Sequence, residues 1–341
     1  MELSILIPAR NEMFLAKTVE DILANREADT EVIALLDGQW ADPPIVQHDR
    51  VKVMYVPESI GQRAATNLAC KLSKAKYMMK VDAHCSFDKG FDRKMLEAFE
   101  RAGDSVTMVP VMRNLWAFDW KCMKCGKKWY QGPTPTSCKE TNFKDTGKPC
   151  DSTTFSRKMR WVGKERPQST SYSFDTEPHF QYFNSYTKRP EYKKMLQETG
   201  FTESMSLQGS AFMCTRQKYW ELGLSDEKLG NWGNQGIEVA VKTWLSGGRV
   251  LVNHNTWYAH MFRTQGGDFG FPWPVSGNDV QKTKENVKNL FWGNNWPKQV
   301  KSLSWLLEKF WPVPGWTEEN LDNLKKEESW HYSQALVSEK L

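Results

Sequence analysis

Short apolar runs alternate with segments of helical period over the first 112 residues of the chain. The runs predict strands because they are short, rich in apolar and β-branched residues, and bounded by turn residues. The predicted strands are residues 3–8, 31–36, 51–56, 77–81 and 105–112, and the predicted helices start at residue 11 and span 62–73 and 92–101. This alternation is typical of an α/β fold with a mostly parallel sheet covered by helices on both faces.

Polar side chains follow three of the predicted strands. Pro8 and Arg10 follow the first, Asp37 ends the second, and Asp82 and His84 follow the fourth. Carboxyl ends of strands meet at one crevice in such sheets, and ligands bind there. Alternation in an extended chain puts Asp82 and His84 on one side, as half of a divalent-cation site. The alternative is a helix-capping Asp beside a core histidine. A dinucleotide site is disfavoured, because no G-x-G-x-x-G follows the first strand.

The second half of the chain is less regular. The polar and aromatic stretch 157–189 predicts surface loops. The other expected elements are a helix at 192–199, strands at 206–214 and 249–253, and helices that begin near 217 and lie within 230–248. Residues 266–277 mix Gly, Pro and aromatic residues, which suits a mobile lid. The last segment is helical in pattern and rich in Trp, and we expect its tryptophans to pack against the domain.

Four of the seven cysteines lie between residues 122 and 150. Cys122 and Cys125 form a Cys-x-x-Cys knuckle, which lets two thiolates take two corners of a tetrahedron, and Cys138 and Cys150 follow. The spacing resembles that of a zinc ribbon. Because the segment has little apolar material of its own, we expect a structural Zn²⁺ to hold it together. The alternatives are a redox pair or scattered buried cysteines.

Composition predicts the cellular location of the protein and distinguishes one basic segment. The odd number of cysteines and the absence of a signal-peptide pattern or a long apolar run predict a cytoplasmic protein without a membrane span. Residues 113–166 carry 13 Lys and Arg against 5 Asp and Glu, a local net charge of +8 in a chain of net charge +5. Cations interleaved with aromatic residues suit contacts with phosphates and bases of DNA. The alternative is a solvated surface.

An ordered series of motifs resembles one family. The motifs are SILIPARNE, LLDG with Asp37, GQRAATN with Arg63, VDAHC with Asp82 and His84, LQGSAFMC, NWGNQGIEVAVKTWLSGG, and YAHMFR with His260 and Arg263. In this order they resemble a GT-A-fold nucleotide-sugar glycosyltransferase of family 2, and most nearly the polypeptide N-acetylgalactosaminyltransferases. The resemblance covers residues 1–112 and 206–271.

The resemblance implies a UDP-sugar donor and a site for Mn²⁺ or Mg²⁺ made by Asp82, His84 and His260. One carboxylate and two imidazoles suit Mn²⁺ better than Ca²⁺. The metal and Arg263 would neutralise the leaving diphosphate. The residues implied in donor binding are Pro8, Arg10, Glu12, Asp37, Arg63, Asp82, Gly209, Trp232, Gln235 and Arg263.

The chain departs from the family pattern near residue 235. Gln235 and Gly236 stand where the related pattern has Glu-Asn, so the sugar-contacting acid is missing there. If the reaction inverts the anomeric carbon, a carboxylate must act as general base, and Glu238 and Asp268 are the candidates. The alternative for Glu238 is a solvated or capping residue in a first helical turn. The sugar and the stereochemical outcome stay open.

We expect four parts in the chain: a nucleotide-binding half (1–112), a basic zinc-ribbon-like insert (113–170), a sugar and acceptor half (171–280) and a Trp-rich helical extension (281–341). Because it has a cysteine insert and no lectin-like domain, the chain is similar to glycosyltransferases encoded by bacteriophages, which would place it in the host cytoplasm. The acceptor hypothesis is a hydroxymethylated pyrimidine in DNA, reached by flipping or in a single strand. The alternatives are a protein Ser or Thr, a glycan, or an inactive GT-A scaffold that binds nucleic acid. The oligomeric state is not predicted.

Overall fold

A parallel sheet forms the first half of the protein, as the sequence predicts. The computed structural model describes residues 1–141, 148–263, 266–273 and 276–338. The strands are β1 (Leu3–Ala9), β2 (Thr30–Asp37), β3 (Val51–Val56) and β4 (Tyr77–Val81), and the helices are α1 (Leu15–Asn25), α2 (Gln62–Leu72) and α3 (Phe91–Ala102). The strands lie in the order β4-β1-β2-β3, and every neighbouring pair is parallel.

Both faces of this sheet are covered. Leu6 of β1 packs in one core with Ala65 and Ala69 of α2, whereas Ile5 and Ile7 pack in a second core with residues of α1 and α3. A strand buried on both faces reads as a continuous apolar run, which is why β1 could be predicted from its sequence. The predicted α/β class is confirmed.

The remaining strands make the sheet mixed. These strands and the next helices are β5 (Cys85–Phe87), β6 (Val106–Cys122), β11 (Phe201–Glu203), β12 (Ala211–Thr215), β13 (Arg249–His260), α4 (Pro190–Thr199), α5 (Arg216–Leu222) and α6 (Gln235–Leu245). The order becomes β11-β13-β6-β12-β4-β1-β2-β3. Strand β12 lies antiparallel to both β4 and β6, while β13 runs parallel to β6. The strand expected at 206–214 starts only at Ala211.

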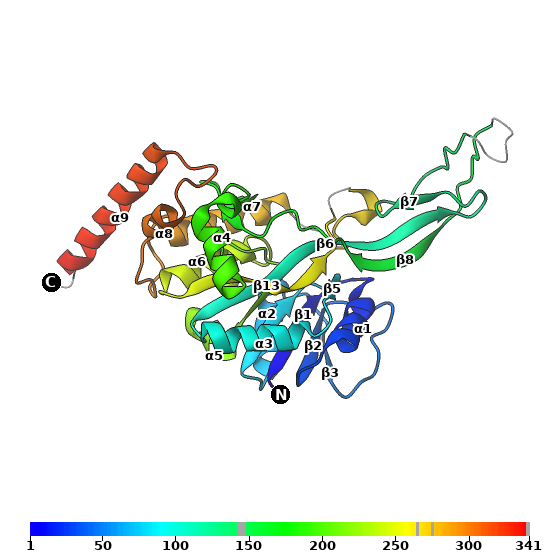
Figure 1. Cartoon of the computed structure of the whole chain (residues 1–341), viewed down its shortest axis with the longest axis horizontal. Helices are drawn as coiled ribbons and strands as arrows, with labels where there is room; N and C mark the ends of the chain where they lie inside the picture. The colour runs from blue at the N-terminus through cyan, green and yellow to red at the C-terminus, as the bar shows by residue number, and fades with distance from the viewer. Residues whose placement is uncertain (142–147, 264–265, 274–275, 339–341) are drawn as a thin grey trace.

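A long hairpin extends from the body (Figure 1). Strand β6 does not end at residue 112 but runs to Cys122, where β7 (Lys128–Tyr130) and β8 (Phe155–Gly163) pair with it antiparallel. We call residues 115–163 the arm. The loops predicted for 157–189 are wrong at β8, β9 (Tyr172–Phe174) and β10 (Phe180–Tyr182). Strand β8 is exposed along most of its length, so its charged residues concealed the strand pattern.

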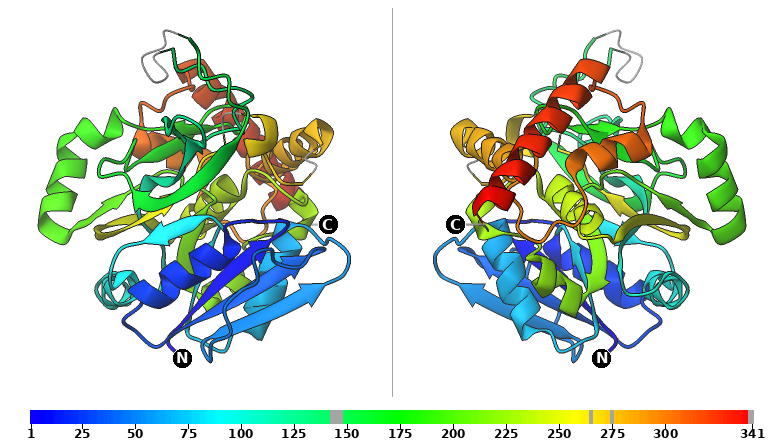
Figure 2. Two further views of the ribbon diagram at one scale, coloured as in Figure 1. Left: turned by 90° about the vertical axis from the view of Figure 1, so that its right-hand side faces the viewer. Right: turned by 90° about the vertical axis from the view of Figure 1, so that its left-hand side faces the viewer.

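The C-terminal segment packs on the body at the end away from the arm (Figures 1 and 2). It contains α7 (Gly277–Phe291), α8 (Leu303–Phe310) and α9 (Glu318–Ser338). Trp296 and Trp316 are buried in the core that α2 and α6 share, and Trp292, Trp305 and Trp311 pack against that core. The predicted packing role of these tryptophans is confirmed. None of the described helices is long and apolar enough to cross a membrane.

Candidate active site

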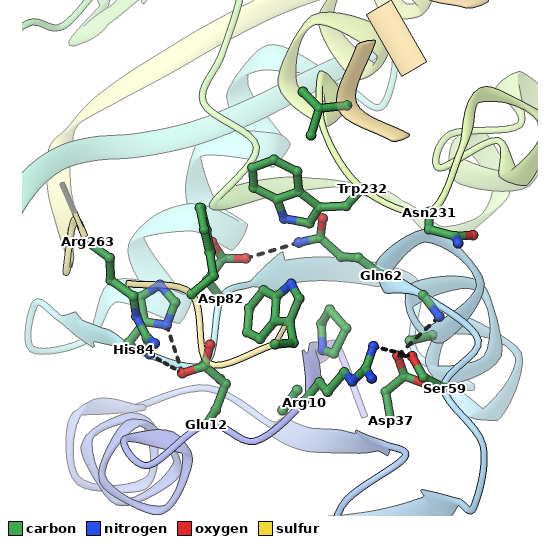
Figure 3. A pocket seen from close by; sticks show the side chains of 18 of the residues that line it. Arg10, Glu12, Asp37, Ser59, Gln62, Asp82, His84, Asn231, Trp232 and Arg263 are labelled. Atoms are coloured by element: carbon green, nitrogen blue, oxygen red, sulfur yellow. Dashed lines mark hydrogen bonds and ion pairs between the residues drawn. The ribbon is translucent and has the colours of Figure 1, made fainter. Parts of the chain in front are cut away.

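A cavity of about 380 Å³ opens at the carboxyl ends of β1, β2 and β4 (Figure 3). This is the edge at which ligands bind in α/β sheets. Phe271 and Trp273 close it from the segment predicted as a lid. The predicted site residues that line it are Pro8, Arg10, Glu12, Asp37, Asp82, His84, Trp232, His260 and Arg263. Residues from five separate motifs therefore converge on one cavity.

Asp82, His84 and His260 bring three potential metal ligands together. Their ligand atoms all lie within 4.8 Å of one another. The Nε2 atoms of the two imidazoles are 3.0 Å apart, and His260 Nε2 is 3.2 Å from a carboxylate oxygen of Asp82. Asp82 follows β4 directly, and a bend at residues 83 and 84 leads into β5. The two side chains lie on one side as predicted, but across a bend and not along an extended segment. Antiparallel pairing of β5 with β13 sets His260 opposite Cys85, next to His84.

Glu12 connects the metal-ligand group to Arg263. Its carboxylate lies 3.4 Å from His84 Nδ1, and Arg263 Nη2 donates to the same oxygen. Both Glu12 and His84 are buried. A carboxylate on the second ring nitrogen of a metal-binding histidine orients the ring and raises its basicity as a ligand. Glu12 thus orients the His84 ring, and it holds the guanidinium group of Arg263 beside the cavity.

Lys80 is a buried cation that the sequence analysis did not include. Its ammonium donates to Asp82 Oδ1 at 2.5 Å and to the carbonyl oxygen of Gly209 at 2.7 Å, and its side chain is fully buried. A charged residue in the otherwise apolar strand YMMKV was the available signal, because buried lysines are rare unless paired. Lys80 leaves Asp82 Oδ2 facing the histidines.

Charge states in the group suit cation binding. Burial would raise the pKa of Asp82, but Lys80, His260 and His84 outweigh burial and hold it well below its usual range. Burial lowers the pKa of His260 to about 4, although the neighbouring Asp82 opposes the shift. At neutral pH the site therefore offers one carboxylate and a neutral imidazole at His260, which are the forms that bind metals.

Asp37 organises the other end of the cavity. Its carboxylate accepts hydrogen bonds from Ser59 Oγ and from the backbone N–H groups of Ile60 and Gly61, at 2.7 to 3.1 Å. Arg10 donates to the same Ser59 hydroxyl at 3.0 Å. In Figure 3, Arg10, Asp37 and Ser59 lie at the end of the cavity away from His84. Asp37 thus fixes the loop before α2, in addition to lining the cavity.

Arg63 and Glu238 form a buried ion pair away from the cavity, which corrects both predictions. Their side chains are 1% and 0% exposed, with Arg63 Nε 2.9 Å from a Glu238 oxygen. Lys242 and the N–H of Asp226 occupy the other oxygen of Glu238. Burial would raise the pKa of Glu238, but Lys242 and Arg63 lower it overall. A fully buried, paired carboxylate is not exposed to an acceptor, and neither Arg63 nor Glu238 lines the cavity.

The pair instead shapes the loop that carries Trp232. Arg63 donates to the carbonyl oxygens of Gly230 and Gly233 at 2.9 and 2.7 Å, holding this loop against α2. Sequence reasoning missed this because the two charges are 175 residues apart.

A second cavity of about 500 Å³ shares Gln62, Asp82, Trp232 and Val280 with the first. Gly209 and Gln235 line it. Gln235 is buried, and its Oε1 has no hydrogen-bond partner among the described residues. The first turn of α6 needs glycine at residue 236, because a Cβ there would lie 2.1 Å from the carbonyl oxygen of Leu207.

Asp268 lies at the arm and outside both cavities. Its carboxylate accepts from the N–H of Thr134 at 2.8 Å and from the Thr134 hydroxyl. These bonds lower the pKa of Asp268. Phe269 is buried against Phe118 at the base of the arm, with ring centroids 5.8 Å apart. The structure therefore makes Asp268 a tether for the lid segment, which corrects its prediction as a general base.

The four cysteines of the arm converge as predicted. Cys122 and Cys150 have sulfurs 3.7 Å apart, and Cys125 and Cys138 have sulfurs 3.5 Å apart. All four sulfurs lie within 4.8 Å of one another, and the cysteines are free. The Cys125 N–H lies 3.5 Å from the Cys122 sulfur. Backbone hydrogen bonds between hairpin turns hold these positions.

Residues 4–161 match the family described as glycosyl transferase family 2. The chain is 21% identical over 324 residues to putative polypeptide N-acetylgalactosaminyltransferase 13 of Drosophila melanogaster, which covers 89% of this chain and 49% of that protein. It is 31% identical over 91 residues to human N-acetylgalactosaminyltransferase 7, which covers 26% of this chain and 14% of that protein. The chain thus spans about half the length, or less, of these curated relatives.

A crystal structure of GalNAc-T7 with UDP, GalNAc and Mn²⁺ superposes with a TM-score of 0.60 at 16% identity, covering 96% of this chain and 54% of that one. This likeness shows the GT-A fold. Residues 4–161 are thus similar to glycosyl transferase family 2, and the fold of the chain is similar to that of a solved enzyme with a nucleotide-sugar site. The predicted resemblance to polypeptide N-acetylgalactosaminyltransferases is confirmed by these relatives.

Proposed function

We propose that the protein transfers a sugar from a UDP-sugar to a hydroxyl acceptor, with Mn²⁺ or Mg²⁺ held by Asp82, His84 and His260. The observation that carries this proposal is the convergence of three ligand atoms within 4.8 Å in a cavity at the carboxyl end of the sheet. The solved relative of the same fold contains UDP, GalNAc and Mn²⁺, which supports the donor and the metal.

The residues present fit a six-coordinate cation. Ligand atoms at right angles around an ion at about 2.1 Å lie about 3.0 Å from one another. The separations of 3.0 and 3.2 Å among the two imidazoles and Asp82 match that spacing. When bound, the metal would act as a Lewis acid on the diphosphate.

The residues of the chain would supply the rest of the site. Arg263 lies beside the cavity and can offset the charge that develops on the leaving diphosphate. Trp232, Phe271 and Trp273 form an aromatic wall that excludes water. In the proposed division of the chain, residues 1–112 bind the nucleotide, 171–280 hold the sugar and acceptor, 113–170 form the insert and 281–341 support them.

The arm would hold a structural Zn²⁺. Four sulfurs bound tetrahedrally at about 2.3 Å lie about 3.8 Å apart. The observed separations of 3.5 and 3.7 Å support that geometry. Hydrogen bonds from the backbone N–H groups of Cys125 and Lys124 outweigh burial and lower the pKa of Cys122 to about 6. Zinc ligation needs reduced thiols, and a reducing cytoplasm keeps thiols in that state. We therefore propose the cytoplasmic location that the sequence predicts.

For the acceptor we propose a hydroxymethylated pyrimidine in DNA, bound through the arm. The basic charge of this segment and its position outside the body support phosphate contacts (Figure 1). Arg157 lies over Trp120 and Arg160 over Trp116, with cation-to-centroid distances of 4.9 and 5.1 Å. These rings are therefore already covered by guanidinium groups, which favours phosphate contacts over base stacking. The names of the curated relatives support a polypeptide hydroxyl as a second candidate acceptor.

The test is UDP release from a panel of UDP-sugars with Mn²⁺, with and without hydroxymethylcytosine-containing DNA. We compare the wild type with His84→Gln, and use His48→Gln as a matched control because His48 is a surface residue outside the cavities. Release that DNA stimulates and His84→Gln abolishes supports donor, metal and acceptor together. Metal-dependent release that DNA does not change removes the DNA proposal, and release independent of His84 contradicts the metal site.

A further inference from the structure

We propose that His179 is the general base that takes the proton from the acceptor hydroxyl, and that Asp175 orients it. This inference rests on the proposed glycosyl transfer. It replaces Glu238 and Asp268, which the structure places outside both cavities. His179 lies in the 157–189 stretch that the sequence pattern assigned to surface loops.

His179 lies in a cavity beside the proposed donor cavity. It lines the second cavity, together with Gln208, Gly209 and Asn234. This cavity joins the donor cavity through shared walls at Gln62, Asp82, Trp232 and Val280. An acceptor entering the second cavity therefore approaches a sugar held beside the metal ligands. The His179 side chain is 49% exposed, so its ring is accessible from the cavity.

Asp175 holds the imidazole in one orientation. Its Oδ1 accepts the backbone N–H groups of Glu177 and His179 at 2.9 and 3.0 Å, which closes the turn between β9 and β10. Its Oδ2 lies 3.0 Å from His179 Nδ1 and 3.2 Å from Gln181 Nε2. The imidazole contact is therefore additional to the bonds that close the turn. With Nδ1–H donating to Asp175, the lone pair of Nε2 is available to a proton.

Contacts from other parts of the chain hold the turn that carries Asp175 and His179. The Asn234 side chain donates to the carbonyl oxygen of Pro178 at 2.6 Å, which ties the turn to the loop before α6. Trp316 Nε1 donates to the carbonyl oxygen of Phe174 at 2.8 Å. Gly315 packs so closely that a Cβ there would lie 2.5 Å from Asp175 Cβ. The Trp-rich extension thus has a direct role in positioning Asp175.

Charged groups near Asp175 and His179 come from the turn itself, from α7 and from the wall shared with the donor cavity. Glu177 in the turn pairs with Lys288 of α7 at 2.7 Å, Lys284 of α7 lines the same cavity, and Asp82 forms the wall shared with the donor cavity. Burial would raise the pKa of Asp175, but hydrogen bonds from His179 and Glu177 lower it overall, so it stays anionic beside the imidazole.

In the proposed step, His179 Nε2 takes the proton of the acceptor hydroxyl while the oxygen of that hydroxyl bonds to the anomeric carbon of the sugar. The bond from that carbon to the β-phosphate oxygen breaks, and UDP leaves with the electron pair. The proton on His179 then passes to solvent. A positioned general base of this kind contributes about 10²- to 10⁴-fold to rate.

The experiment uses water as the acceptor, so that no assumption about DNA enters. UDP release from the UDP-sugar panel with Mn²⁺ is followed from pH 5 to 9 for the wild type, His179→Gln, Asp175→Asn and the matched control His48→Gln. UDP affinity is measured for each by calorimetry. We expect the wild-type rate to fall on the acid side, because protonation of the base removes its ability to accept the proton of the acceptor. We expect His179→Gln to lose at least about a hundredfold in rate and to lose that acid limb, with UDP affinity unchanged.

The outcomes separate the two proposals. If His179→Gln keeps the wild-type rate and pH profile, or loses rate only in step with UDP affinity, the general-base assignment is overturned while the glycosyltransferase proposal stands. Asp175→Asn should give an intermediate rate and a displaced acid limb, and an unchanged profile contradicts its orienting role. If the wild type releases no UDP from any donor, the proposed function itself fails, and the base assignment fails with it.

Discussion

Two groups of potential metal ligands differ in what holds them together. Asp82, His84 and His260 leave the ends of strands buried in the main sheet, so packed strands position them whether or not a metal is bound. The cysteines of the arm form a small cluster, and among the residues that the structure describes, Trp129 and Phe155 are the aromatic side chains packed against it. A segment with so little apolar contact depends on its metal for structure. Under the proposed function, we therefore expect the first group to serve chemistry and the second to stabilise the arm.

The largest effect should come from removing a ligand in the body. His84→Gln should lower metal-dependent UDP release by about a thousandfold, because Lewis-acid stabilisation is worth several kcal/mol and each 1.36 kcal/mol is tenfold in rate. The folded body should persist, as measured by the thermal unfolding midpoint. An Asp82 variant is less informative, since it leaves Lys80 buried without its carboxylate partner. A large loss of stability in His84→Gln would contradict the statement that packed strands position the ligands of the body without a metal.

Removing a cysteine ligand in the arm should unfold part of the arm and leave the body folded. Cys138→Ser, or removal of zinc by a chelator, should increase amide hydrogen exchange throughout β7 and the outer half of β8 while the body keeps its protection. Bound zinc, measured by elemental analysis, should fall to zero. Cys70→Ser is the control, because Cys70 lies in the main core and should leave zinc content intact. An arm that stays protected without zinc would show that packing alone holds it.

The buried pair of Arg63 and Glu238 should matter for folding and little for proton transfer. Glu238→Gln leaves Arg63 and Lys242 buried without a full counter-charge, which should lower the free energy of unfolding by about 3–5 kcal/mol. Chemical denaturation measures this change, with Glu191→Gln as the exposed control. If Glu238→Gln keeps full stability but loses transfer at unchanged UDP affinity, Glu238 is the base after all.

The contact between the arm and the lid should give the smallest effect. Thr134→Val removes one hydrogen bond to Asp268 and keeps the backbone bond, so it should weaken donor binding by about fivefold, equivalent to about 1 kcal/mol. The KM for the UDP-sugar should rise with little change in kcat. Thr187→Val, which also loses one surface hydrogen bond, is the control. An unchanged KM would show that the arm and the donor cavity are independent.

Local pattern predicted the parts of the protein that are buried on both faces. Strands β1 and β4 could be predicted because nearly every residue in them is apolar. The spacing of Asp82 and His84 predicted that both side chains lie on one side, although a bend and not an extended segment brings them there. His260 came from the resemblance, since its pairing with β5 joins segments far apart in sequence. The ion pair of Arg63 with Glu238 could not be found from either motif, because burial of a charge depends on the fold. The Asp175 and His179 pair lay in a stretch whose short strands carry no clear period.

We propose above that UDP binding in the body requires a metal held by Asp82, His84 and His260. Calorimetric titration of UDP into the protein, with Mn²⁺ and then with a chelator, tests it most directly. We expect UDP to bind the wild type and Cys138→Ser only when Mn²⁺ is present, and to bind His84→Gln poorly in both conditions. Equal binding of UDP to the wild type with and without metal, or undiminished Mn²⁺-dependent binding by His84→Gln, would contradict it.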